Sequence, residues 1–285
     1  MSIRQVNPEE HNHNVSDVNH VKEVIILVLS IFAILIALYW SSIFALDSIV
    51  ERLSPEREAQ LMKYIGSSKK LNPLISDKKE ENVEPRLLRA RQLLNELLQF
   101  SDLKNRSFEV VVIPGKDINA FAIPGDTILL VEELLDKVES ENELAMVLGH
   151  ELGHFHYRHH LKGMGRRLVM GFFSMMIFGD DNPISKLFLG GLDYTDRQFN
   201  QAQESDCDLF GAGLVFKKYG HLAGGLVFFE RLAEKEGIME KYFSTHPLSV
   251  ERVDRISIYA QENNWPLIGE LTPLAPRKGS ASDSP

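Results

Sequence analysis

Twenty-three consecutive residues, Val24 to Leu46, carry no charge and consist largely of Ile, Leu, Val, Phe and Ala. A helix rises 1.5 Å per residue, so this run would extend about 34 Å, enough to cross a hydrocarbon core of about 30 Å. Tyr39 and Trp40 stand near its far end, and such aromatic side chains are common at membrane interfaces. The run predicts one transmembrane helix and contact with a lipid bilayer.

A cleaved signal peptide is the alternative for this run. It is the weaker alternative, because the run is long, little positive charge precedes it and no small-x-small cleavage site follows it. The orientation stays open. Arg4 and Lys22 precede the run, and Arg52, Arg57 and Lys63 follow it, which weakly favours a cytoplasmic C-terminal side. Long domains often cross the membrane regardless of such charges.

The composition of the chain excludes some classes of partner and site. A net charge of −9 argues against a nucleic-acid partner, which requires a basic surface. Cys207 is the single cysteine, so there is no intrachain disulfide and no zinc site built on cysteine pairs. Any metal ion must be held by histidines and carboxylates.

The chain is expected to divide into a tail, a transmembrane anchor, a helix with a polar linker, one folded domain and a disordered tail rich in Pro, Ser and Ala. The corresponding residues are 1–23, 24–46, 47–84, 85–271 and 272–285.

Helical patterns dominate the folded domain, and two runs rich in β-branched residues, 108–113 and 127–131, indicate strands. Gly125 and Asp126 indicate a turn before the second strand. The sequence predicts an α+β fold, mainly helical, with a small antiparallel sheet.

The segment His150-Glu151-Leu152-Gly153-His154 places two histidines four residues apart. On a helix both imidazoles point the same way and can reach one zinc ion. Glu151 lies about 100° further round the helix, beside the ion, where a base for an activated water is required. The bare pattern can arise by chance, but a core helix does not normally present two histidines and a glutamate on adjoining faces without a function.

Catalytic zinc usually has three protein ligands, so a third ligand is expected downstream. Glu204 and Asp208 are four residues apart and share a helical face. Glu204 can bind the metal while Asp208 accepts the second ring N–H of a ligand histidine. The alternative is a solvated acidic face, and Asp206 is a local competitor for the ligand role.

Four sequence blocks give the chain a resemblance to the gluzincin metallopeptidases that include HtpX and the CAAX prenyl proteases, especially the branch of BepA and the mitochondrial Oma peptidase. The resemblance runs from about Ser54 to Ile256. The blocks are Asn119–Gly125 (NAFAIPG), Glu143–His154 (ELAMVLGHELGH), Glu204–Asp208 (ESDCD) and Ser244–Pro247 (STHP) with Arg252.

This resemblance implies a zincin-like catalytic domain with one Zn²⁺ per chain, whose third ligand is Glu204. It also implies that His246 assists catalysis as a second electrophile, and that Asn119, Ala120 and Phe121 form a strand edge that holds extended substrate. Without the resemblance, His246 would be taken for a surface histidine in a turn.

Two positions depart from the family pattern. Asp126 replaces a second glycine, which affects a turn. Gln201 replaces an arginine three residues before the ligand glutamate, so an ion pair of the site is either missing or supplied elsewhere.

The function implied is a membrane-anchored zinc metalloendopeptidase that cleaves unfolded or membrane-associated proteins in membrane or envelope quality control. The resemblance favours an extracytoplasmic (periplasmic) catalytic domain. A catalytically silent zinc-binding or chaperone-like membrane module is the alternative, but a structural zinc site needs no adjacent base such as Glu151. An aminopeptidase is a further alternative, without a recognisable groove for a free N-terminus.

The sequence does not assign a role to two features that follow the His-Glu-x-x-His segment. His156, His159 and His160 are expected to be solvated or packed against an acidic surface, and no carboxylate that would make them a second metal site is evident. Residues 168–178 are apolar but too few to span a bilayer. They are expected to form either a buried helix or one that enters the membrane surface.

Overall fold

The computed structural model describes residues 19–66, 84–116, 118–123, 125–179, 183, 200–227, 230 and 250–276. The chain divides into two compact units, residues 1–45 and 46–285. Most of helix α1 (His20–Arg52) belongs to the first unit, and its apolar side chains are exposed, Ile25 and Phe32 among them. By length and composition, α1 is the one helix within the described ranges that is suited to cross a membrane.

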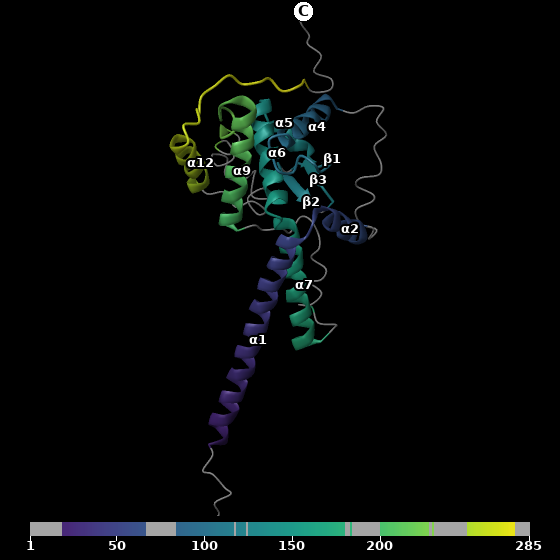
Figure 1. The fold of residues 1–285 in the computed structure, drawn as a ribbon, viewed down its shortest axis with the longest axis vertical. Coiled ribbons are helices and arrows are strands. Elements are labelled where there is room, and N and C mark those ends of the chain that lie inside the picture. Colours follow the sequence, from purple (N-terminus) through teal and green to yellow (C-terminus); the bar gives the residue numbers. More distant parts are fainter. Residues whose placement is uncertain are drawn as a thin grey trace, which may run out of the picture. The chain divides into compact units, whose positions relative to one another are not determined.

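The second unit is mainly helical and contains a small sheet (Figure 1). After the end of α1, its elements are α2 (Pro55–Gly66), α4 (Pro85–Leu98), β1 (Glu109–Ile113), β2 (Ala120–Ile123), β3 (Thr127–Val131), α5 (Glu132–Lys137), α6 (Glu141–His156), α7 (His159–Phe178), α9 (Gln201–Tyr219) and α12 (Val250–Glu262). The predicted fold class, mainly helical α+β with a small sheet, is confirmed.

The sheet is mixed, whereas the sequence predicted an antiparallel one. Its strand order is β1-β3-β2, with β3 antiparallel to β2 and parallel to β1. The segment between β1 and β2 leaves one strand position free between them. β3 then forms a hairpin with β2 and occupies this central position. All five residues of β3 are buried, as expected for a central strand. The edge strand β2 packs on α6.

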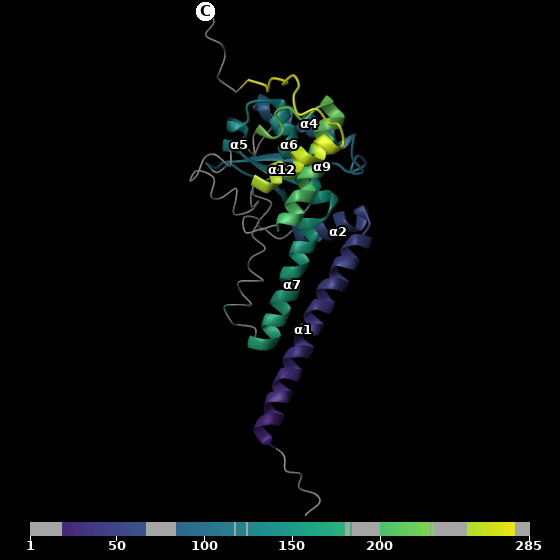
Figure 2. The same cartoon turned by 90° about the vertical axis from the view of Figure 1, so that its left-hand side faces the viewer.

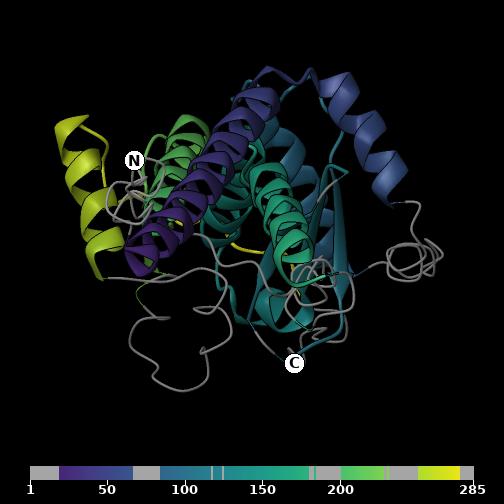
Figure 3. The same cartoon turned by 90° about the horizontal axis from the view of Figure 1, so that it is seen from below.

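The turn between β2 and β3 explains the departure at Asp126. Gly125 and Asp126 both have positive φ, 94° and 57°. Aspartate tolerates this left-handed conformation better than most residues. Its carboxylate also forms an ion pair with Arg106, which in turn pairs with the buried Glu58 of α2 at 2.9 Å. Asp126 therefore helps to hold α2 on the sheet side of the unit (Figure 3).

Helix α6 is the centre of the unit, and every residue from Glu141 to Phe155 is buried. It packs against α9 on one side and against α4 and β2 on the other (Figure 1). Ser140 caps the helix, because its hydroxyl accepts a hydrogen bond from the backbone N–H of Glu143 at 3.2 Å. Helix α12 covers the outer side of α9 (Figure 2).

Residues 272–276, which the sequence assigned to a disordered tail, include two that are hydrogen-bonded to the folded unit, Thr272 to the start of α6 and Ala275 to α4. The N–H of Thr272 donates to Asn142 Oδ1, and its carbonyl accepts from the N–H of Glu141, both at 2.9 Å. Arg86 of α4 donates to the carbonyl of Ala275 at 3.0 Å. The folded part therefore extends beyond residue 271, because the first backbone groups of a helix need partners that this segment supplies.

Three glycines bring α6 and α9 unusually close. A Cβ added at Gly149 would lie 2.9 Å from the Cα of Gly211, and one at Gly153 would lie 2.8 Å from the Cα of Cys207. Backbones in such contact leave no space for a side chain. The glycine within the His-Glu-x-x-His segment thus sets the distance between α6 and the helix that carries Glu204.

Replacing Gly153 by alanine is expected to lower stability by about 1–3 kcal/mol, because the methyl group meets backbone that cannot move aside cheaply. Gly163→Ala in α7 is the matched control, since a Cβ there has no atom within 4 Å. It should leave stability unchanged or raise it by about 0.5–1 kcal/mol. Thermal unfolding of both variants measures this, and equal melting temperatures would contradict the close packing of α6 and α9.

Candidate metal centre

The two histidines and the glutamate predicted as metal ligands lie together at the α6–α9 interface. The Nε2 atoms of His150 and His154 are 3.2 Å apart, and the Glu204 carboxylate oxygens lie 3.4 Å from the first and 3.5 Å from the second. Three donors at 2.0–2.1 Å from a tetrahedral ion are separated by about 3.3 Å. The three side chains are buried and converge on one point, so they fit a single zinc ion.

Local structure explains why Glu204 converges on this point and Asp206 does not. Asn200 caps α9 by accepting from the N–H of Gln203 at 2.9 Å, and Gln203 accepts from the N–H of Asn200 at 3.1 Å. In the helix that follows, Glu204 faces α6 and is fully buried, whereas Asp206 is exposed.

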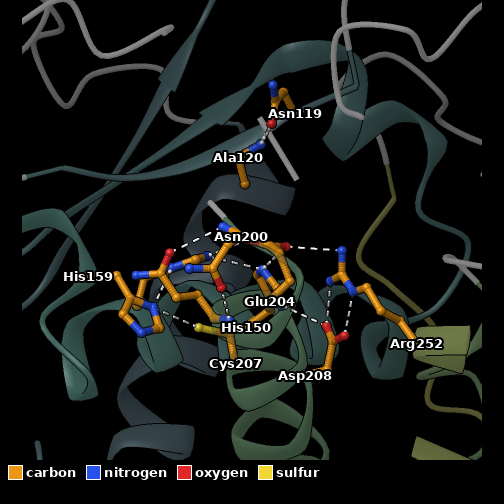
Figure 4. Close-up of polar contacts among 11 residues, drawn as sticks. Asn119, Ala120, His150, His159, Asn200, Glu204, Cys207, Asp208 and Arg252 are labelled. Atoms are coloured by element: carbon orange, nitrogen blue, oxygen red, sulfur yellow. Dashed lines mark hydrogen bonds and ion pairs between the residues drawn. The ribbon is translucent and has the colours of Figure 1, made fainter. Parts of the chain in front are cut away.

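Asp208 occupies the position expected for a partner of a ligand histidine. Its Oδ1 accepts from the Nδ1 of His150 at 2.9 Å, which leaves Nε2 to face the other donors. Arg252 of α12 holds the same carboxylate with two hydrogen bonds of 2.7 Å and lies 3.0 Å from Glu204 (Figure 4). Arg252 thus forms ion pairs with both carboxylates, whereas Gln201 is exposed.

The electrostatics of the cluster favour a cation. Burial alone lowers the pKa of His150, but the carboxylates of Glu204 and Asp208 outweigh burial and raise that pKa to about 10. Burial also opposes ionisation of Asp208, yet hydrogen bonds from Arg252 and His150 bring its pKa below the ordinary value. The surroundings therefore stabilise positive charge at the His150 imidazole, and a bound divalent metal supplies such charge.

Glu151, the predicted base, follows His150 on α6 and is buried, with 1% of its surface exposed. Asn119 and Ala120 stand at the start of β2, which packs on α6, and are drawn above the donor cluster in Figure 4. Ala120 and Phe121 belong to the edge strand β2, and Asn119 Oδ1 accepts from the N–H of Ala120 at 2.9 Å. His246 lies outside the described residues.

The sequence did not reveal the role of His159. It is buried, and its Nδ1 lies 3.2 Å from the Nδ1 of His154. Burial lowers the pKa of His159 to about 4, so the ring is neutral at pH 7 and can accept a hydrogen bond from His154. His159 thus contacts the Nδ1 of His154, just as Asp208 contacts the Nδ1 of His150. Both ligand histidines thus have a partner that fixes the ring orientation.

His156 and His160 each pack against a carboxylate, one of the two arrangements expected for them. His156 pairs with Asp102 at 2.8 Å near the surface, and His160 is buried 3.3 Å from Glu58. A second group of possible donors within the described ranges, His154, His159 and Cys207, shares His154 with the first. Burial raises the pKa of the Cys207 thiol, which disfavours the thiolate that a metal needs. The first group is therefore the better metal site.

Replacing His159 by alanine is expected to weaken zinc binding by about 10–100-fold, because His154 loses the acceptor that orients its ring. Competition with a chromogenic chelator measures the affinity without reference to catalysis. His156→Ala is the matched control, since that ring lies near the surface and contacts none of the three donors. Equal zinc affinities for the two variants would show that His159 does not position His154.

Comparison with known proteins adds a family match to this geometry. The sequence model of peptidase family M48 matches residues 86–260, more than half of the chain. Metalloprotease LoiP of Escherichia coli (strain K12) is 33% identical over 153 residues, which cover 51% of this chain and 60% of LoiP. Mitochondrial metalloendopeptidase OMA1 of Arabidopsis thaliana is 28% identical over 158 residues, 53% of this chain and 31% of OMA1.

A putative beta-barrel assembly-enhancing protease of Vibrio cholerae is 26% identical over 160 residues, which cover 51% of this chain and 33% of that protein. The matched region thus spans 60% or less of each of these three relatives. The similarity includes α6 and α9, the two helices that carry the donor cluster.

Proposed function

The chain belongs to peptidase family M48, and on that premise we propose that it is a membrane-anchored zinc metalloendopeptidase with one Zn²⁺ held by His150, His154 and Glu204. The observation that carries the proposal is the separation of the three donors, 3.2, 3.4 and 3.5 Å. Catalytic zinc is typically bound by three imidazole or carboxylate ligands, and its fourth position stays open. A structural site would close that position with a fourth side chain.

When bound, zinc supplies Lewis-acid chemistry that polarises a carbonyl and acidifies water. Glu151 takes a proton from the attacking water and delivers it to the leaving amine. His246 donates to the developing oxyanion, as the family resemblance implies. The edge strand β2 holds the substrate backbone in extended form near Asn119, Ala120 and Phe121. Asp208, His159 and Arg252 keep the donors oriented.

The substrates we propose are unfolded or membrane-associated proteins, cleaved during membrane or envelope quality control. The exposed apolar side chains of α1 support a retained single-pass anchor, because such a surface is stable in lipid and costly in water. Family resemblance supports an extracytoplasmic catalytic unit. Of the three relatives described above, OMA1 is named as mitochondrial and the Vibrio cholerae protein for beta-barrel assembly.

The test uses the full chain in detergent, with measurements of bound zinc per chain and cleavage of unfolded casein with blocked termini. We expect one zinc per chain, internal cleavage, and loss of activity with a chelator that zinc restores. Bound zinc without cleavage of any unfolded substrate, in detergent or in vesicles, would favour the catalytically silent zinc-binding or chaperone-like module. A folded protein that binds no zinc would overturn the assignment of the donors.

A further inference from the structure

The second half of α7 exposes an apolar surface that the proposed function does not use. Residues 168–178 carry no charge, and five of their side chains are between 45% and 57% exposed: Leu168, Phe172, Met176, Ile177 and Phe178. Leu168, Phe172 and Met176 are spaced four residues apart and form one stripe, and the other two lie at the end of the helix. Contiguous exposed apolar surface of this kind usually marks a site of interaction.

The first half of α7 is charged, and its basic side chains form ion pairs with the end of α1. Within the second unit, Lys162 pairs with Glu51 at 2.8 Å and Arg166 pairs with Asp47 at 2.6 Å. Gly165 allows Leu46 to approach so closely that an added Cβ would meet it at 2.5 Å. As numbers rise along α7 they fall along α1, so the two segments run antiparallel.

These ion pairs align the two helices at the point where each changes from charged to uncharged residues. Leu46 is the last residue of the uncharged run of α1, and Asp47 is the first charge after it. On α7, Arg166 and Arg167 are the last charges before the apolar half. The ion pair between Asp47 and Arg166 therefore marks the level at which each helix changes from charged to apolar.

We infer that the second half of α7 is a second membrane contact, inserted into the leaflet that faces the catalytic unit. Eleven helical residues extend about 16 Å, close to half of a hydrocarbon core of about 30 Å. Lys162, Arg166 and Arg167 stand at the level of the lipid phosphates, where basic side chains are favoured. Asp180 and Asp181 follow in the sequence, and because charge is costly in hydrocarbon, they limit the insertion to a depth short of the bilayer centre.

The occupant is lipid because the ion pair between Asp47 and Arg166 fixes the start of the apolar half at the level where the uncharged run of α1 ends. A soluble partner would have to displace lipid from a surface that starts at this level. This inference depends on the retained anchor, so the test examines both helices separately. It does not depend on peptidase activity.

The test places a fluorescent label at single introduced cysteines of the full chain in phosphatidylcholine–phosphatidylglycerol vesicles. Phe172→Cys and Met176→Cys report on the stripe, and Gly163→Cys is the control in the charged half, with no atom within 4 Å of its Cβ. Leu29→Cys, an exposed position of α1, is the reference for lipid contact. Cys207 is buried and should remain unlabelled in the folded protein. Zinc content and circular dichroism verify folding.

We expect a lipid-borne quencher to dim the labels at 172, 176 and 29, and a water-soluble quencher to dim only the label at 163. Water exposure at 172 and 176 with lipid contact at 29 would overturn the inference and leave the anchor standing. Water exposure at 29 would instead overturn the anchor, and the inference with it. Protection from both quenchers at 172 and 176 would assign the stripe to protein, either a second copy or residues 180–199, and would also overturn it.

Discussion

Replacing Glu151 by glutamine should abolish most peptide cleavage while the chain still binds one zinc. A positioned general base contributes about 10²–10⁴-fold to rate, and this is the loss expected in kcat. Glutamine has the shape of glutamate but cannot take a proton. Glu151 is not one of the three converging donors, so the affinity for zinc should change little. Parallel measurement of zinc content and casein cleavage separates the two effects.

Glu132→Gln is the matched control for this prediction, because it makes the same chemical change at an exposed position of α5. It should retain wild-type activity. Two results would contradict the role of Glu151 as base. One is a Glu151→Gln enzyme with near-normal kcat, and the other is loss of zinc in parallel with activity, which would make Glu151 a ligand.

The Glu204→Gln variant should lose zinc itself and, as a consequence, activity. Loss of an outer partner of a ligand already costs about 10–100-fold in affinity, so loss of a charged ligand should cost more than about 100-fold. The substitution also removes the carboxylate that lies 3.0 Å from Arg252, a buried guanidinium that Asp208 would then neutralise alone. Some destabilisation of the α9–α12 contact should accompany the loss of zinc.

A melting experiment checks this prediction without an activity assay. Zinc that binds only the folded state raises stability by about 4 kcal/mol at a thousandfold excess over Kd. The wild type should therefore melt at higher temperature with zinc, and Glu204→Gln should not respond. Asp206→Asn, two residues further along α9 and exposed on its other face, is the control and should respond like the wild type. A full zinc response of Glu204→Gln would exclude it as a ligand.

The part of the site that the sequence predicted is the part that depends on local helical geometry. His150 and His154 are one turn apart, and so are Glu204 and Asp208, so the spacing alone places each pair on one face. What the spacing could not give is the contact between the two helices. That contact depends on Gly149, Gly153 and Gly211, and a glycine in a helix does not reveal what it packs against.

The contacts of His159 could not be predicted from the sequence, for a geometric reason. A continuous helix through residue 159 would carry it round the axis, away from the donor face. Instead, Arg158 adopts the left-handed conformation with φ of 56°, which ends α6 and directs His159 back toward His154. Non-glycine residues adopt this conformation rarely, so the sequence gives no warning of it. Arg252 is a similar case, because its partners on α9 lie 44 residues or more away in the chain.

For the strands, too, the sequence predicted the elements but not how they pair. The runs at 109–113 and 127–131 were recognisable from their β-branched residues, and the hairpin before the second from Gly125 and Asp126. Which strand is central cannot be read from such runs, because a buried strand at the centre of a sheet and one at its edge have similar composition. The parallel pairing of β1 with β3 is for this reason a result of the structure.

The junction between α6 and α7 has a mechanical consequence. Only Tyr157 and Arg158 separate the two helices, and Arg158 is fastened to the carbonyl of Val50 at the end of α1 by a hydrogen bond of 2.5 Å. His159, the first residue of α7, contacts His154. A change in the tilt of α7 about Arg158 would therefore be passed by His159 directly to His154, the second histidine of the donor cluster.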